Sequence, residues 1–134
     1  MKSPDDVLAE LSIFSELSSG EIRKIRSLMT KLDIPAGKTF ITEGSTVMEA
    51  FILVEGQAVV TRDGEKLATL GPGDVVGELA VLAGVPRTAS VTAESDLVVE
   101  VLNRREFISL LDQEPPVMKS ILIGALRRLH ELQS

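Results

Sequence analysis

Residues 50–73 read AFILVEGQAVVTRDGEKLATLGPG, and this stretch decides the fold. It contains three short runs rich in β-branched and aliphatic residues, separated by turns that contain glycine. Both central residues of a type I′ turn need positive φ, so Asp63-Gly64 predicts a tight hairpin between the runs on either side of it. The stretch is therefore typical of short antiparallel strands joined by tight turns.

The same pattern extends outward over residues 33–102. Short β-prone runs recur about every ten residues, with glycine or proline between them. This spacing predicts a small antiparallel barrel or jelly roll rather than alternating βαβ units. The expected strands cover residues 38–42, 50–55, 57–62, 66–70, 87–93 and 97–102.

Helical patterns flank this β-roll. Residues 5–32 read as helical, with Asp5 or Asp6 able to cap a first turn and Ser18 or Ser19 opening a second helix that runs to Leu32. After the roll, Asn103 can cap a helix over residues 104–111. Pro115-Pro116 then breaks the chain, and an amphipathic helix follows over residues 117–132.

We therefore expect one α+β, mainly β domain over residues 1–134. It consists of N-terminal helices (1–32), an antiparallel β-roll (33–102) and C-terminal helices (103–132). A short helix near residue 78 is expected to interrupt the strands of the roll.

The composition of the chain argues against several classes of function. The chain has 134 residues, 44% hydrophobic residues, a net charge of −6, no cysteine and one histidine. These numbers favour a cytoplasmic single domain and argue against a thiol nucleophile, a multi-histidine metal site and direct nucleic-acid binding. No apolar stretch approaches the ~20 residues of a membrane span, and the N-terminus does not read as a signal peptide.

The chemistry is concentrated in residues 71–90, GPGDVVGELAVLAGVPRTAS. A two-turn helix over residues 77–84 would expose its first N–H groups to an anion. Arg87 follows at once and offers a planar fork that suits a phosphate. Glu78 would accept a hydrogen bond from a sugar hydroxyl, and Gly77 would let the backbone approach the ligand. Together these residues predict a site for a phosphorylated sugar.

The motif GELAVLAGVPRTA at residues 77–89 resembles the phosphate-binding cassette of the cyclic nucleotide-binding domain family, loosely G-E-[LI]-A, a short gap, then P-R-[ATS]-A. This family includes bacterial catabolite activator proteins, regulatory subunits of the cAMP-dependent kinase and cyclic-nucleotide-gated channels. The resemblance runs from about Leu11 to the C-terminus. The glycines of the roll match the family in order, at Gly37, Gly44, Gly56, Gly71 and Gly73.

The resemblance implies a role for each cassette residue. Arg87 would pair with the cyclic phosphate, and Glu78 would accept from the ribose 2′-OH. Thr88 would add a hydroxyl near the phosphate or base. A hydroxyl at this position does not distinguish cAMP from cGMP, and we favour cAMP as the ligand. The implied ligand-binding set is Gly77, Glu78, Leu79, Ala80, Pro86, Arg87, Thr88 and Ala89. The chain has no Tyr or Trp to stack on the base, so Arg127 or Arg128 is a candidate cap through cation–π contact.

Each of these features also has a purely structural interpretation. Arg87 and Glu78 taken singly fit a surface salt bridge, and basic residues near the end of the last helix suit its negative dipole end. The apolar stripe of that helix has three competing uses: packing on the roll, or, as the resemblance implies, closing over the base or forming a homodimer through residues 117–132. The stripe consists of Met118, Leu122, Ala125, Leu129 and Leu132.

We expect a non-enzymatic cyclic nucleotide sensor with no metal and no cofactor besides its ligand, whose last helix transmits the signal by a population shift. Two alternatives stay open. The chain is the sensor part of a larger transcription factor, channel or transferase, or it is a degenerate roll that serves as an interaction or dimerisation scaffold.

Overall fold

Two four-stranded antiparallel sheets form the centre of the molecule in this computed structural model, which describes residues 3–133. The side chains of Glu78, Leu79, Leu82, Ala125 and residues 128–133 lie outside that description. The strand orders are β1-β8-β3-β6 and β2-β7-β4-β5. The strands are β1 Thr30–Ile34, β2 Thr39–Ile41, β3 Glu49–Glu55, β4 Ala58–Arg62, β5 Glu65–Leu70, β6 Val75–Val76, β7 Ser90–Ala93 and β8 Leu97–Asn103.

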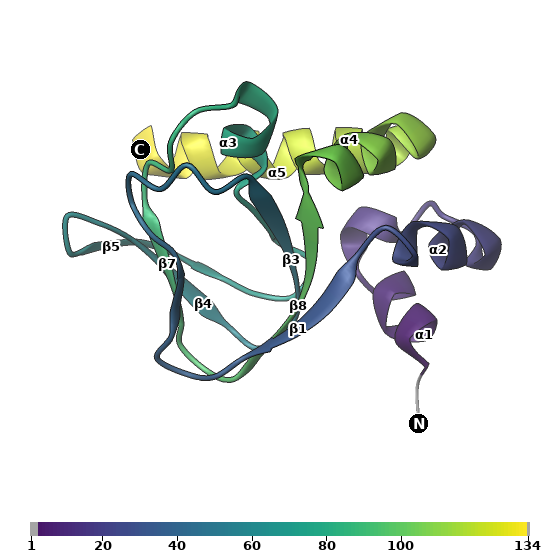
Figure 1. The fold of residues 1–134 in the computed structure, drawn as a ribbon, viewed down its shortest axis with the longest axis horizontal. Coiled ribbons are helices and arrows are strands. Elements are labelled where there is room, and N and C mark those ends of the chain that lie inside the picture. The colour runs from purple at the N-terminus through teal and green to yellow at the C-terminus, as the bar shows by residue number, and fades with distance from the viewer. Residues whose placement is uncertain (1–2, 134) are drawn as a thin grey trace.

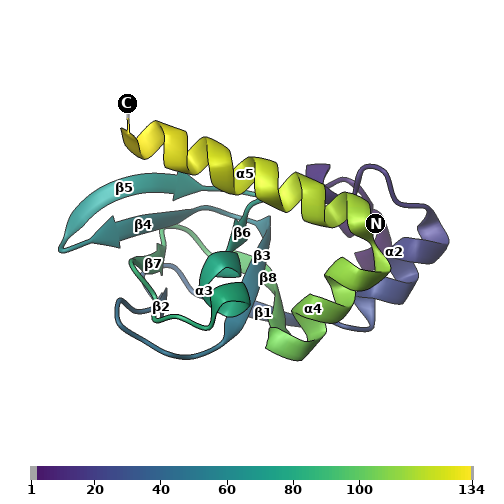
Figure 2. The same ribbon diagram turned by 90° about the horizontal axis from the view of Figure 1, so that it is seen from above.

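Helices cover one end and one side of this roll (Figure 1). α3, α4 and α5 lie at the top of Figure 1 and in front of the strands in Figure 2, whereas α1 and α2 lie beside the end of β1. The mainly β fold with flanking helices is the expected class. The helical elements are α1 Pro4–Ala9, a 3₁₀ turn Ser12–Phe14, α2 Ser19–Arg26, α3 Glu78–Ala83, α4 Arg104–Gln113 and α5 Pro115–Gln133.

The central strand β3 separates two hydrophobic cores. Its residues are buried from Ala50 to Val54 in an unbroken run, because both of its faces are covered. Phe51 and Leu53 point into the core between the sheets, while Ala50, Ile52 and Val54 pack with the helices. This explains the continuous apolar sequence of β3, which is typical of a strand buried on both faces.

The Asp63-Gly64 hairpin is confirmed. Both residues have positive φ, 52° for Asp63 and 81° for Gly64, and β4 pairs with β5 across them. The conformation is the one that a type I′ turn requires. The other expected strands also form, with ends that differ by a few residues from the expected bounds.

The helix expected to run to Leu32 is wrong beyond Arg26. Residues 30–34 form β1, which pairs antiparallel with β8 so that Lys31 faces Glu100 and Leu32 faces Val99. The apolar spacing in this region fitted a helix, but pairing with β8 overrides that local preference. The roll therefore begins at Thr30 and not at residue 33.

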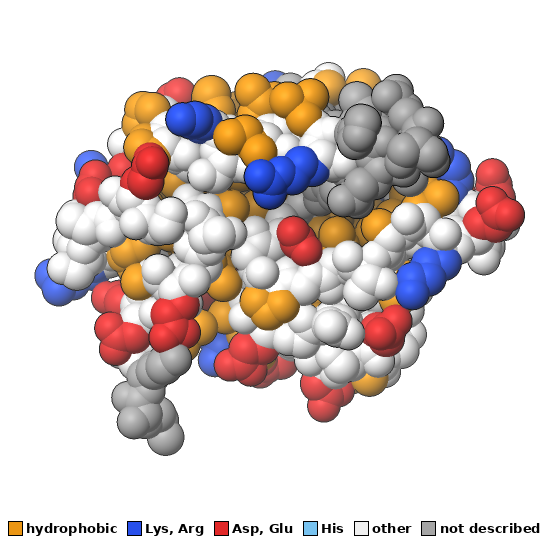
Figure 3. Space-filling model, turned by 180° about the vertical axis from the view of Figure 1, so that it is seen from behind, with side chains coloured by type: hydrophobic (Ala, Val, Ile, Leu, Met, Phe, Trp, Pro, Cys, Tyr) orange, Lys and Arg blue, Asp and Glu red, His pale blue; other side chains and the backbone are white. Residues whose placement is uncertain are grey.

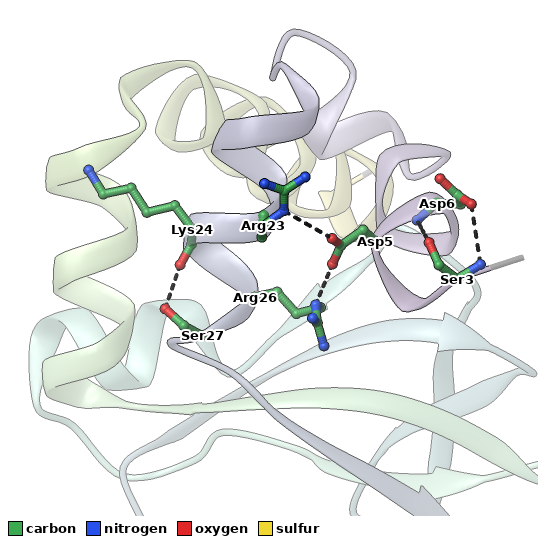
Figure 4. Close-up of polar contacts among 7 residues, drawn as sticks. All are labelled: Ser3, Asp5, Asp6, Arg23, Lys24, Arg26 and Ser27. Carbon is green, nitrogen blue, oxygen red and sulfur yellow. Dashed lines mark hydrogen bonds and ion pairs between the residues drawn. The ribbon is translucent and has the colours of Figure 1, made fainter.

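Two smaller expectations about the helix ends also need correction. Ser3, and not Asp5 or Asp6, caps α1, with Asp6 completing a capping box. Asp5 instead joins the first two helices: Arg23 Nε lies 4.0 Å from its Oδ2, and Arg26 pairs with its Oδ1 (Figure 4). Ser18 opens α2 as expected.

At the other end of the roll, Asn103 caps α4 as expected. The break before the last helix falls at Glu114, where φ is −132° and ψ is 77°. The two prolines are then the first residues of α5, where their missing N–H groups cost nothing.

Candidate phosphate-binding site

A short helix interrupts the strands at the expected place. Gly77 and Gly84 bound α3 as its N-cap and C-cap, and both have left-handed backbone conformations, with φ of 86° and 68°. Glycine adopts such conformations without the penalty that a Cβ atom brings. The sequence GELAVLAG therefore encodes both ends of this helix. The short strand β6 precedes it and was not predicted, because two valines are too few to show a period.

Arg87 is buried at the beginning of this helix, with a relative exposure of only 6%. Its Nη1 donates to the carbonyl oxygen of Gly77 at 2.9 Å, and its Nη2 donates to the carbonyl of Glu49 on β3. Arg87 was expected at the start of a strand, but it precedes β7, which begins at Ser90. The guanidinium thus bridges β3 and the start of α3.

The backbone of Arg87 is also fixed, by a loop far away in sequence. Its N–H donates to the carbonyl of Ser45 at 2.9 Å, and its carbonyl accepts from the N–H of Gly44 at 2.9 Å. This pairing explains why a residue outside a strand has a defined position. Residues 44–45 follow β2, so the glycine turn there supports the cassette directly.

Beyond the arginine, the cassette is held by β4. Arg62 Nε donates to the carbonyl of Thr88 at 3.0 Å. Arg62 was not among the predicted site residues. The hairpin signal placed it at the end of its strand, but only the pairing of Thr61 with Ser90 brings that end to the cassette.

The remaining predicted ligand-binding residues are spread over α3 and the loop after it. Pro86 and Thr88 are exposed, Ala89 is half-buried, and Ala80 is buried. Glu78 and Leu79 begin α3, but their side chains lie outside the described residues, as does that of Arg128. Arg127 is exposed on α5.

Two carboxyl groups outside the cassette have raised pKa values. Burial raises the pKa of Glu100 on β8, although Lys31 and Arg26 partly oppose this shift. Burial raises the pKa of Glu114 at the α4–α5 junction, and the neighbouring carboxyl of Glu21 raises it further. Glu100 lies on β8 and Glu114 at the end of α4, and we expect their raised pKa values to make stability depend on pH.

The last helix has two different faces. Val117 and Ile121 are buried against the helical core. Met118, Leu122, Ile123 and Leu126 are between 41% and 56% exposed, and Figure 3 shows hydrophobic side chains along the edge where α5 runs. The predicted stripe is therefore not packed on the roll at Met118 and Leu122; its other members lie outside the described side chains.

A separate cavity of about 540 Å³ opens between β1 and β2, with Leu32, Phe40 and Phe51 among its lining residues. It contains no cassette residue. Among the residues that the structure describes, no three His, Cys, Asp or Glu side chains are placed to hold a metal ion. Within the same part of the chain, no helix combines the length and apolarity that crossing a bilayer requires.

The fold and this site define a ligand-binding roll of a known class. Residues 31–114 match the family model of the cyclic nucleotide-binding domain. The chain belongs to this family. This confirms the resemblance that the cassette motif indicated.

Individual relatives agree. The chain is 43% identical over 110 residues to a cAMP-dependent protein kinase regulatory subunit of Yarrowia lipolytica, a match that covers 80% of this chain and 29% of that protein. It is 28% identical over 130 residues to a CRP-like cAMP-activated global transcriptional regulator of Mycobacterium tuberculosis, covering 93% and 58%. The structure of Sp-2Cl-cAMPS bound to PKAR CBD2 superposes with a TM-score of 0.82 at 28% identity, covering 97% of this chain and 89% of that one.

The chain therefore spans about a third of the kinase subunit and somewhat over half of the transcriptional regulator. Both relatives are regulatory proteins by name. The chain is accordingly similar to the parts of those proteins that it aligns with, and it shares the cyclic nucleotide-binding domain family model.

Proposed function

We propose that this domain binds cAMP in preference to cGMP and acts as a non-catalytic cytoplasmic sensor. The observation that carries the proposal is the buried guanidinium of Arg87, held by the carbonyls of Gly77 and Glu49 beside the start of α3. A fixed guanidinium fork is well suited to a cyclic phosphate. The match to two proteins whose names state a link to cAMP supports the choice of ligand.

In this proposal different residues of the cassette bind different parts of the nucleotide. Arg87 binds the phosphate, together with backbone N–H groups of Gly77, Leu79, Thr88 and Ala89. Glu78 accepts from the ribose 2′-OH. The hydrogen bond from Arg62 to the Thr88 carbonyl supports the role given to the backbone of Thr88, because it holds that stretch of backbone in place. Arg127 or Arg128 on α5 stacks on the base.

The exposed face of α5 is the proposed output. Its apolar side chains are 41–56% exposed, so they have surface available for new contacts when ligand binds. We propose that this face either closes toward the nucleotide or pairs with a second copy of the chain. Sedimentation of the wild type and of Leu122→Glu, with and without cAMP, separates the two, because only pairing doubles the sedimenting mass and only a dimer would revert to a monomer in Leu122→Glu.

A second candidate is that the domain is the sensor part of a larger transcription factor. The match to the CRP-like regulator favours it, because 93% of this chain is aligned with only 58% of that protein. In that case the change in α5 on ligand binding is transmitted to a further domain. The ligand and the site are the same in both candidates.

Isothermal titration with cAMP, cGMP and adenosine tests the proposal. We expect saturable binding of one cAMP per chain, weaker binding of cGMP, and adenosine weaker than both because it offers Arg87 no anion. Adenosine binding as tightly as cAMP would contradict the phosphate role of Arg87. No binding of either cyclic nucleotide would support the scaffold alternative.

A further inference from the structure

A continuous set of hydrogen bonds leads away from the phosphate site through α3. The carbonyl oxygen of Gly77 accepts from Arg87 Nη1 at 2.9 Å and also from the N–H of Val81 at 3.0 Å. The second bond is the first helical turn of α3. Any change in how Arg87 holds Gly77 therefore acts on the same oxygen that begins this helix.

The other end of α3 is tied to α4. The N–H groups of Gly84 and Val85 both donate to the carbonyl of Ala80, at 2.8 and 3.2 Å, and Pro86 has no N–H. The carbonyl of Val81 is thus left without a backbone donor among the described residues, as is usual for the last carbonyls of a helix. Arg104 Nε, from the first residue of α4, donates to it at 3.1 Å.

The position of Arg104 is not explained by the stability of its own helix. A cation in the first turn of a helix faces the positive end of the helix dipole, which is unfavourable. Arg105 lies in the same turn and, within the described residues, makes no hydrogen bond or ion pair. The bond to Val81 therefore distinguishes Arg104 from its neighbour. Val81 itself is fully buried in the helical core.

We propose that Arg104 is a positioning residue that fixes the end of α3 against the start of α4, so that a change at Arg87 and Gly77 is passed to α4 and from there to α5. The route uses only contacts that the structure contains: Arg87 to Gly77, Gly77 to Val81, and Val81 to Arg104. The signalling half of this inference rests on the proposed binding of cAMP, whereas the positioning half does not.

Amide hydrogen exchange on the whole chain tests both halves, with Arg104→Ala compared against Arg105→Ala. The control removes the same charge from the same helical turn. Without nucleotide, Arg104→Ala should speed exchange in residues 78–84 about tenfold, which is the loss of ~1.4 kcal/mol of local stability. Arg105→Ala should match the wild type there. Equal exchange of residues 78–84 in the two variants would overturn the proposal whether or not the protein binds cAMP.

With saturating cAMP, the wild type and Arg105→Ala should gain protection in residues 78–89 and also in residues 104–133. Arg104→Ala should keep the first response, with an affinity within about tenfold of the wild type, and lose most of the second. Undiminished protection of residues 104–133 in Arg104→Ala would contradict the coupling role. Failure of the wild type to bind cAMP would overturn the proposed function, and the ligand-free comparison would still decide whether Arg104 positions α3.

Discussion

A Cβ atom on Gly77 would lie 2.1 Å from Nη1 of Arg87 and 2.9 Å from its Cζ. The guanidinium therefore occupies the space that any other residue at position 77 would need. The same glycine has a φ of 86°, which L side chains rarely adopt. Two independent constraints thus make Gly77 part of the arginine site.

Gly77→Ala should displace Arg87 and weaken cAMP binding by roughly 30-fold or more, about 2 kcal/mol. Gly84→Ala is the matched control: its φ is 68°, but no atom lies within 4 Å of an added Cβ. It should lose about 1 kcal/mol of stability from the left-handed backbone alone and keep its affinity. Titration and urea unfolding of both variants measure this difference, and equal affinities would show that Arg87 tolerates the displacement.

The proposed sugar contact predicts discrimination against a ligand without the 2′-OH. If Glu78 accepts from that hydroxyl, 2′-deoxy-cAMP should bind the wild type about tenfold more weakly than cAMP, because the carboxylate loses a charge-assisted hydrogen bond. Glu78→Gln should reduce this ratio. Competition binding with both nucleotides measures it. Equal binding of the two by the wild type would remove Glu78 from the sugar site.

The two faces of α5 should respond differently to truncation. Ile121 is 7% exposed and packs in the helical core, so Ile121→Ala should lower the free energy of unfolding by about 2–4 kcal/mol. Its neighbour Leu122 is 56% exposed, and Leu122→Ala should change it by no more than about 0.5 kcal/mol. Urea unfolding checks both. A loss at Leu122 as large as that at Ile121 would mean that a second chain covers this face in solution.

Glu100 predicts a pH dependence of stability. Burial raises its pKa in the folded state, so the folded protein binds this proton more tightly than the unfolded chain does. Its contribution to stability is therefore present at low pH and is lost as the pH rises from the ordinary carboxyl pKa through the raised one. Glu100→Gln should remove this loss, so the variant should gain stability relative to the wild type between pH 4 and pH 7. Thermal unfolding of both proteins at both pH values measures this difference in stability. A stability gain of Glu100→Gln over the wild type that becomes smaller as the pH rises would contradict the prediction.

The sequence predicted the parts of this molecule that depend on local chemistry. The glycine turns, the Asp63-Gly64 hairpin and both ends of α3 follow from which residues tolerate positive φ. The cassette motif gave the position of Arg87 along the chain. These features need no knowledge of distant partners.

The parts that the sequence did not predict depend on pairing at long range. β1 forms because residues 30–34 meet β8, some 65 residues away, and its own spacing looked helical. Arg62 and Arg104 reach the cassette from other strands and helices, through bonds to the backbone carbonyls of Thr88 and Val81. Bonds to backbone carbonyls require no particular residue at the accepting position, so they leave no pattern to read.

The central claim is that Arg87 binds the phosphate of a cyclic nucleotide, and titration of Arg87→Ala with cAMP tests it most directly. Arg87→Lys and thermal unfolding accompany it, because the arginine also holds two backbone carbonyls. With the fold intact, Arg87→Ala should bind about 30- to 1,000-fold more weakly than the wild type, about 2–4 kcal/mol, and Arg87→Lys should also bind more weakly because a point charge does not reproduce the fork. Wild-type affinity in a folded Arg87→Ala would contradict the claim.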